Sequence, residues 1–314
     1  MLGNTLFLIG IVIAVVIGFA YFRDLGDVSQ MFMRVKRKHM IRFIRNEYRL
    51  LAVGLGATAL MGLAYFALDG ATAWLFWPAL ILVGVLYGFP WVYVHLGLRN
   101  QMSTAKYYSI DEAKELVSPS SSVVVIEKDG VARAHPDSQI LRPHLAGNEE
   151  GLNGENVVMT YCAMANLGIG YTPEIEGKKV DLEVLAQHGN NLILRDNTTG
   201  EPIQHIYGYR EKDGKSGPAM KPWPTFRMSF RGFQKAYPDG TVFLNKPSAN
   251  PLVRLFDMAM DTAFTSGIVR QHNEAKPLMN NMTHSDDRLP NKTYVWGVNI
   301  GEDAVCYTDD FIGE

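Results

Sequence analysis

The distribution of apolar residues divides the chain near residue 100. Three long apolar segments, at 6–22, 50–68 and 73–98, lie before that point, and no comparable segment follows. Each is long enough, or nearly so, to cross ~30 Å of hydrocarbon as a helix that rises ~1.5 Å per residue. The pattern predicts a membrane anchor of three transmembrane helices in residues 1–100 and a water-soluble domain in residues 101–314.

A basic segment joins the first two apolar runs. Between residues 28 and 49 the helical period gathers basic residues on one side and the apolar residues Val28, Phe32, Val35 and Phe43 on another. This pattern is typical of an amphipathic helix on an anionic membrane surface, and a charged connector that only fixes topology has the same composition. The residues expected at the membrane surface are Arg34, Lys38, Arg42, Arg45 and Arg49.

The second and third apolar runs are separated only by residues 69–72, which predicts a tight helical hairpin. Small residues let helices approach closely in a membrane, and Gly84 and Gly88 have the small-xxx-small spacing. The glycines expected at helix-packing contacts are Gly54, Gly62, Gly84 and Gly88.

The basic residues also predict an orientation. The loop between the first two apolar runs carries eight Lys and Arg residues, and neither residues 1–5 nor residues 69–72 carry any. The positive-inside rule places such a loop in the cytoplasm. The third helix would return the chain to that side, so this argument predicts a cytoplasmic soluble domain.

Composition narrows the class of protein without naming it. The net charge of −2 shows no basic excess, so we expect no nucleic-acid partner. The two cysteines, Cys162 and Cys306, are too few for a disulfide scaffold and do not have the spacing of a zinc finger.

Strand signals dominate the segment after residue 100. Residues 123–127 and 131–134 predict a hairpin around a Lys-Asp-Gly turn, and 156–161 and 192–195 predict further strands. The hairpin segment 123–140 weakly resembles 295–312 in its order of strand, Gly-containing turn, strand and acidic helix start. The predicted fold class is therefore a membrane protein with three transmembrane α-helices followed by a β-rich α+β soluble domain that contains a weak internal repeat.

Several short motifs follow one another along this domain. They are Ala134-His135-Pro136, His144, the run from Val157 to Cys162, Tyr237-Pro238-Asp239 and the run from Asp287 to Pro290. This succession resembles the family catalogued as domain of unknown function 3179, or DUF3179, whose pattern has Ala-Tyr-Pro, His-Glu and Thr-Tyr-Cys-Pro-Leu-Cys. The resemblance implies a fold but no reaction, and it implies an exported domain, against the charge-based orientation.

Two positions depart from the family pattern. His135 stands where the family has Tyr, and Ala165 stands where it has the second cysteine of Cys-x-x-Cys. A redox dithiol would then require Cys306 as the partner of Cys162.

One group of side chains has the chemistry of a metal site. Thiolate, thioether and imidazole ligands suit copper, and thiolate with imidazole suits zinc. The candidate ligands are Cys162, Met164, His144, His188 and His205. Two other interpretations stay open: Cys162 and Met164 as buried core residues, and Cys162 as a nucleophile with His144 or His188 as its base.

Two functions follow as hypotheses. The first is an accessory, non-catalytic subunit that contacts the lipid bilayer and other membrane-protein subunits, and whose β-rich domain binds or caps partner proteins of a larger complex. It is favoured because the sequence contains no complete catalytic constellation. The alternative is a protein that handles copper, zinc or a thiol at Cys162.

Overall fold

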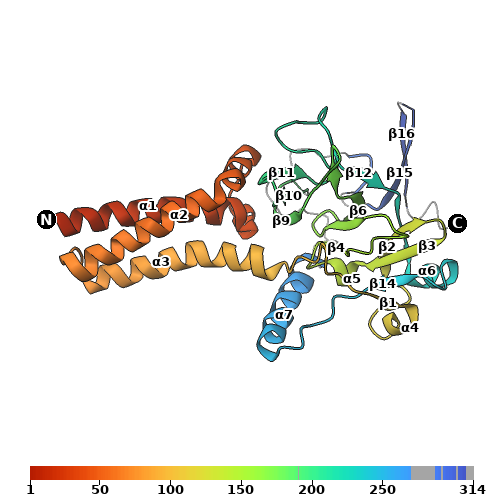
Figure 1. Ribbon diagram of the computed structural model, residues 1–314, viewed down its shortest axis with the longest axis horizontal. Helices are drawn as coiled ribbons and strands as arrows, with labels where there is room; N and C mark the ends of the chain where they lie inside the picture. The colour runs from red at the N-terminus through yellow and green to blue at the C-terminus, as the bar shows by residue number, and fades with distance from the viewer. Residues whose placement is uncertain (190, 270–286, 291–292, 302, 309–314) are drawn as a thin grey trace.

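The computed structural model describes residues 1–189, 191–269, 287–290, 293–301 and 303–308. A bundle of long helices lies at one end of the molecule and a sheet-rich domain at the other, with the N-terminus at the far end of the bundle (Figure 1). The long helices lie within residues 2–97 and the strands follow from residue 107 on.

The three apolar runs form the three long helices of the bundle. These helices and the short helical turns that extend them are α1 (Leu2–Leu25), η1 (Asp27–Met31), α2 (Arg37–Leu68), α3 (Ala73–Trp91) and the π-helical turn η2 (Val92–Gly97). Each long helix is long and apolar enough to cross a membrane, the third together with η2. This confirms the three predicted candidate spans, and Asp69 ends α2 in a left-handed conformation at the expected turn.

Helix α1 makes the closest contacts in the bundle. A Cβ atom at Gly10 would lie 2.9 Å from the carbonyl oxygen of Ala57, and one at Gly18 would lie 2.5 Å from the ring of Tyr87. Tyr87 also donates a hydrogen bond of 2.8 Å to the carbonyl of Ala14. The spacing Gly10-x3-Ala14-x3-Gly18 thus provides the small-residue face that admits α2 and α3.

The four glycines selected from the sequence differ in their surroundings. Gly54 lies directly against the hydroxyl of Tyr87, so a side chain there has no space. A Cβ atom at Gly62, Gly84 or Gly88 would meet no atom within 4 Å among the described residues. These three positions face outward from the bundle.

The basic segment continues directly into the second span. Helix α2 runs from Arg37 through the apolar run, so only the second part of the predicted amphipathic segment, from Arg37 on, is continuous with the predicted span, and the first part contains the separate turn η1. Of the predicted apolar face, Val35 and Phe43 are buried against α1 and the soluble domain, whereas Val28 and Phe32 are exposed. The five basic residues expected at the membrane surface are exposed: Arg34, Lys38, Arg42, Arg45 and Arg49.

The domain is built from several small sheets. Within the described residues, one has the strand order β1-β14-β3-β2-β13, another β12-β6-β5-β4 and a third β11-β10-β9. Most neighbouring strands are antiparallel, and β14 and β3 are parallel. The strands are β1 (Tyr107–Ser109), β2 (Ser122–Lys128), β3 (Val131–Pro136), β4 (Leu145–Gly147), β5 (Val158–Cys162), β6 (Leu167–Thr172), β7 (Glu174–Ile175), β8 (Lys178–Lys179), β9 (Leu182–Gln187), β10 (Leu192–Asp196), β11 (Glu201–Gln204), β12 (Lys221–Trp223), β13 (Thr225–Ser229) and β14 (Thr241–Phe243).

Short helices cover the edges of these sheets. They are α4 (Ile110–Ala113), α5 (Asp137–Ile140), α6 (Phe230–Ala236), α7 (Pro251–Phe264) and the π-helical turn η3 (Thr265–Val269). Ser109 and Glu112 cap the start of α4 reciprocally, as the sequence predicted for Ser109. The main core lies between the sheets and includes Tyr161, Leu194 and Phe243.

The two segments of the proposed repeat both form hairpins. The first is β2–β3 within the largest sheet, and the second is β15 (Val295–Ile300) with β16 (Asp303–Thr308). The second hairpin forms a separate two-stranded sheet in the described part of the chain, so the two do not occupy equivalent places. The helix start expected after it lies outside the described residues.

Candidate functional site at the junction of the helices and the domain

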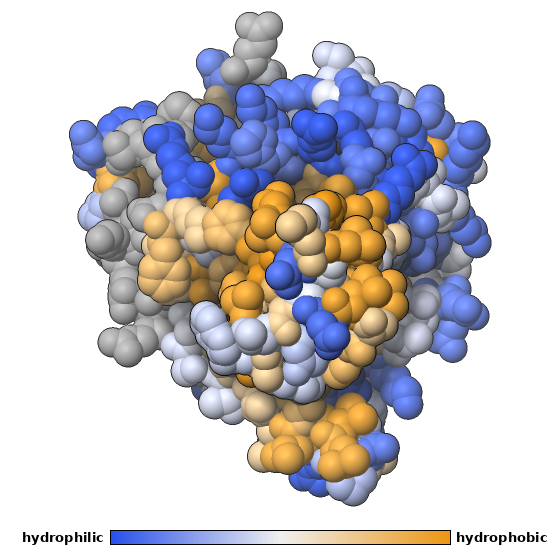
Figure 2. All heavy atoms as spheres, turned by 90° about the vertical axis from the view of Figure 1, so that its left-hand side faces the viewer, coloured by the Kyte–Doolittle hydropathy of each residue, from blue (hydrophilic) through white to orange (hydrophobic). Residues whose placement is uncertain are grey.

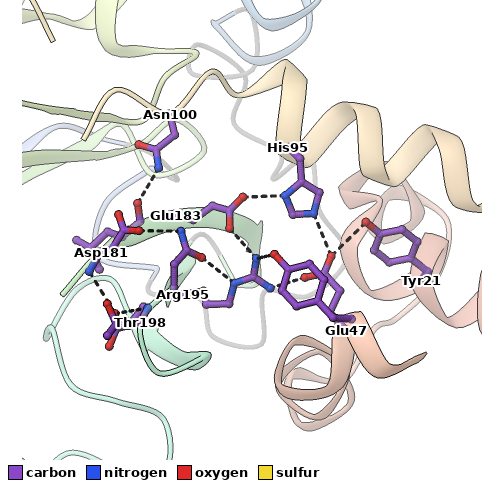
Figure 3. A network of polar contacts seen from close by, with 12 residues as sticks. Tyr21, Glu47, His95, Asn100, Asp181, Glu183, Arg195 and Thr198 are labelled. Atoms are coloured by element: carbon purple, nitrogen blue, oxygen red, sulfur yellow. Dashed lines mark hydrogen bonds and ion pairs between the residues drawn. The ribbon is translucent and has the colours of Figure 1, made fainter. Parts of the chain in front are cut away.

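A network of buried charges connects the helix bundle to the domain (Figure 3). Glu47 of α2 forms an ion pair with Arg195 of β10, and the guanidinium of Arg195 also contacts Glu183 of β9 at 2.7 Å. His95 of η2 lies between the two carboxylates, 3.1 Å from Glu47 and 2.7 Å from Glu183. The network therefore contains groups from two helical elements and two strands.

Local structure explains why these groups meet. Arg195 and Glu183 are directly paired across β10 and β9, which places both side chains on one face of that sheet. Glu47 is fully buried, and Tyr21 of α1 donates a hydrogen bond of 3.2 Å to it. The hydroxyl of Tyr48 accepts a hydrogen bond of 2.9 Å from Arg195.

The charges in the network compensate one another. Burial alone would lower the pKa of Arg195, but Glu47 and Glu183 raise it above its ordinary value. Burial would likewise raise the pKa of Glu183, but its hydrogen bond to His95 and the charge of Arg195 lower it. Since ionised carboxylates only accept hydrogen bonds, both ring nitrogens of His95 act as donors, as in an imidazolium ion. Two negative and two positive groups then share a site largely removed from water.

A cavity of ≈ 490 Å³ lies beside this network. Its walls come from η1, the end of α3, η2, β9, the segment after β5, α7 and η3, and most of the lining side chains are apolar. The polar residues of the wall include Asp27, His144 and Gln187. A mostly apolar cavity with a few polar groups is the usual form of a small-molecule site.

Asp27 is the acidic residue of the cavity wall. Its carboxylate accepts hydrogen bonds of 3.2 Å each from the amide of Gln30, the hydroxyl of Tyr93 and the backbone N–H of Gln187. Burial raises the pKa of Asp27 to about 7, although these hydrogen bonds oppose the rise. The carboxyl group therefore gains or loses a proton near neutral pH.

The residues expected to bind a metal are distributed over this region. The carbonyl of His144 accepts a hydrogen bond from the N–H of Tyr161, and the ring of His205 bonds to the hydroxyl of Thr160 at 2.8 Å. Both imidazoles are buried, and burial lowers the pKa of His144 to about 4 and that of His205 to about 3. The proximity of His144 contributes to the shift at His205, so these two residues are neighbours.

The other candidate ligands have separate surroundings. Cys162 is fully buried at the end of β5, Met164 lines the cavity with His144, and His188 bonds to the carbonyl of Val35 at 2.9 Å. Within the described residues, no three His, Cys, Asp or Glu side chains are grouped closely enough to share a metal ion.

The thiol of Cys162 is in an environment that favours its protonated form. Burial raises its pKa to about 11. A nucleophilic cysteine needs the opposite shift. Cys306 is exposed on β16, and both cysteines are free thiols.

Sequence reasoning missed the acidic residues of this site. Glu47 is the sole acidic residue between positions 28 and 68, within a basic stretch next to an apolar run. A single carboxylate in that position is a signal for a buried partner, because its burial alone would be costly. Asp27, Glu183 and Arg195 carry no comparable local signal.

These features define a class: a protein with three candidate membrane spans fused through buried charges to a sheet-rich domain. The family model described as "Protein of unknown function (DUF3179)" matches residues 101–314, so the chain belongs to the DUF3179 family. No curated protein and no solved structure matches the chain.

Proposed function

We propose that the protein is an integral-membrane accessory subunit whose sheet-rich domain binds partner proteins of a larger complex. The observation that carries the proposal is the apolar face of the hairpin β15–β16. In its register Trp296 pairs with Tyr307 and Val298 with Val305, so these side chains lie on one face together with Ile300. All five are exposed by more than a third, and Ile300 is 67% exposed.

The position of this hairpin favours a protein partner over lipid. The hairpin lies on the part of the domain remote from the helix bundle (Figure 1), where a bilayer around the helices does not reach. Apolar patches of this kind, outside a membrane, mark surfaces that bind other proteins.

Two further features support a structural role. The buried network of Glu47, Arg195, Glu183 and His95 fixes the domain to the end of the bundle, so a partner on the domain would be held at a defined distance from the membrane. The outward positions of Gly84 and Gly88 leave space on α3 for the helix of another membrane subunit.

We propose the cytoplasm as the location of the domain. The start of α2, with its exposed basic residues, lies at the domain end of the bundle, where Arg37 forms an ion pair with Glu211. The positive-inside rule therefore assigns the domain and the basic segment to the same, cytoplasmic side. A membrane-impermeant maleimide tests this, because Cys306 is exposed and Cys162 is buried. Intact cells should leave Cys306 unlabelled; labelling equal to that in permeabilised cells would place the domain outside.

The hairpin variant V298D tests the partner-binding proposal. A carboxylate in the middle of the apolar face should remove bound partners from particles extracted in mild detergent, as measured by native mass spectrometry. The matched control is V131D, because Val131 is a similarly exposed valine at the turn of the other hairpin. Equal partner content in both variants would refute binding through β15–β16.

A further inference from the structure

The cavity at the junction lies at the level where the bilayer surface is expected. Phe89 and Tyr93, at the domain end of the third span, form part of its wall, and Val28 and Met31 follow the first span directly. The hydrocarbon region therefore ends next to the cavity.

Helix α7 gives a second reason to place the cavity at the membrane surface. Its inner side closes the cavity with Met260, Ala263 and Phe264, and the ring of Phe264 stacks on that of Tyr93 at 6.0 Å. Buried Asp257 holds the helix in place through ion pairs with Arg142 at 2.9 Å and Arg99 at 3.0 Å.

The outer side of α7 is apolar and exposed, with Leu252 81% and Leu255 67% exposed. The helix crosses the direction of the bundle (Figure 1), and seen from the bundle end a group of hydrophobic residues lies at its level (Figure 2). Such a helix is suited to the membrane interface.

Polar groups of the cavity wall have unused hydrogen-bonding capacity. Gln187 is 3% exposed, and neither its amide nitrogen nor its amide oxygen has a partner among the described residues. The Nδ1 atom of buried His144 is likewise without one. Buried polar groups are nearly always paired, so these atoms indicate a missing hydrogen-bonding molecule.

From these observations we infer that the cavity binds a single-chain amphiphile from the bilayer, with an apolar chain and an uncharged, hydroxyl-bearing head group. The hydroxyl can both donate to and accept from Gln187 and His144, and it can donate to Asp27. An anionic head would face the Asp27 carboxylate in a poorly hydrated site, which is unfavourable. The volume of ≈ 490 Å³ lies in the lower part of the range of about 300–1,000 Å³ for sites that hold one small ligand, so one chain is favoured over two.

A photoreactive ligand tests this inference with the full chain in phosphatidylcholine nanodiscs. The probe is mono-oleoylglycerol with a diazirine in its acyl chain, and crosslinked peptides are mapped by mass spectrometry. We expect saturable crosslinks in η1, β9 and η3, which excess mono-oleoylglycerol removes and equal excess oleate at pH 8.5 removes far less. Crosslinks spread along the outer surfaces of the bundle, without competition, would overturn the inference.

Two variants of α7 sharpen the test. Both Ala263 and Ala259, one turn earlier, are exposed, but only Ala263 is among the residues that line the cavity. A263W should weaken the competing affinity of mono-oleoylglycerol by about tenfold, the effect of excluding about two methylene groups, and A259W should leave it unchanged. Equal affinity in both variants would contradict binding in this cavity, and the wild-type crosslinking pattern gives an answer even if A263W fails to fold.

Discussion

Glu47, in the second candidate span, forms a buried ion pair with Arg195, which lies 148 residues further along the chain in the sheet-rich domain. Glu47 has no exposed side-chain surface and Arg195 has 2%. This pair makes the position of the domain relative to the helices part of the fold. Removing one partner leaves the other charge buried and uncompensated.

The first prediction concerns this pair. E47Q should lower the free energy of unfolding by about 3 kcal/mol, because Arg195 and His95 lose a charged partner in a buried site. Thermal unfolding of the full chain in detergent, followed by intrinsic fluorescence, measures the loss. The matched control is R45Q, in the same helix, because Arg45 forms a more exposed pair with Glu201 and its loss should cost less than about 1 kcal/mol. Equal effects would show that the buried network does not stabilise the junction.

The second prediction separates inward from outward glycines. G18L should prevent assembly of the bundle, since a Cβ atom at Gly18 already meets the ring of Tyr87 at 2.5 Å. G84L should leave the purified chain folded, because the space around Gly84 is open, but should release partner subunits that pack on α3. Size-exclusion profiles and partner content distinguish the two effects. Retention of all partners by G84L would argue against this face as a helix contact.

The third prediction is a pH dependence of stability at Asp27. Because burial raises its pKa from 3.8 to about 7, the folded protein keeps a proton that the unfolded chain loses above pH 4. The stabilising contribution is therefore complete below pH 4 and is lost as the pH rises through 7. D27N removes this titration, so the difference in Tm between D27N and the wild type should increase in favour of D27N from pH 5 to pH 8. A constant difference would show that Asp27 does not titrate in this range.

The fourth prediction tests the alternative function at Cys162. A copper or zinc site there requires a stoichiometric metal in the purified wild-type protein and its loss in C162S. Because no three His, Cys, Asp or Glu side chains of the described residues are grouped closely enough to share a metal ion, we expect the same metal content, at background level, in both proteins. Elemental analysis by mass spectrometry decides between them, with C306S as the control. One equivalent of metal in the wild type and none in C162S would establish the metal site.

Local patterns in the sequence predicted the architecture well, and contacts between distant segments poorly. Three apolar runs, the turn at Asp69 and the first hairpin follow from composition and period alone, and all are present. The packing of α1 also has a sequence signal, the spacing of Gly10, Ala14 and Gly18, whereas the same spacing at Gly84 and Gly88 lies on a face that contacts no other helix in the described part of this chain. Spacing shows that a face can be closely packed, and only the fold shows which face is.

The junction site was not predictable in the same way. In the sequence, Glu183 and Arg195 look like ordinary polar residues of strands. Their contacts with Glu47 and His95 depend on how the domain packs against the bundle. The apolar side of the basic segment gave a clear amphipathic signal. In the structure, however, Val35 and Phe43 pack against α1 and the sheet-rich domain. An amphipathic period identifies a buried face without identifying what covers it.

The mass of the particle that carries this chain in its native membrane tests the proposed function most directly. The full chain would be extracted in mild detergent and examined by native mass spectrometry. We predict a discrete particle with partner proteins in fixed ratio to the chain, and a smaller particle for V298D. A lone chain or a homo-oligomer, unchanged in V298D, would contradict the role of an accessory subunit.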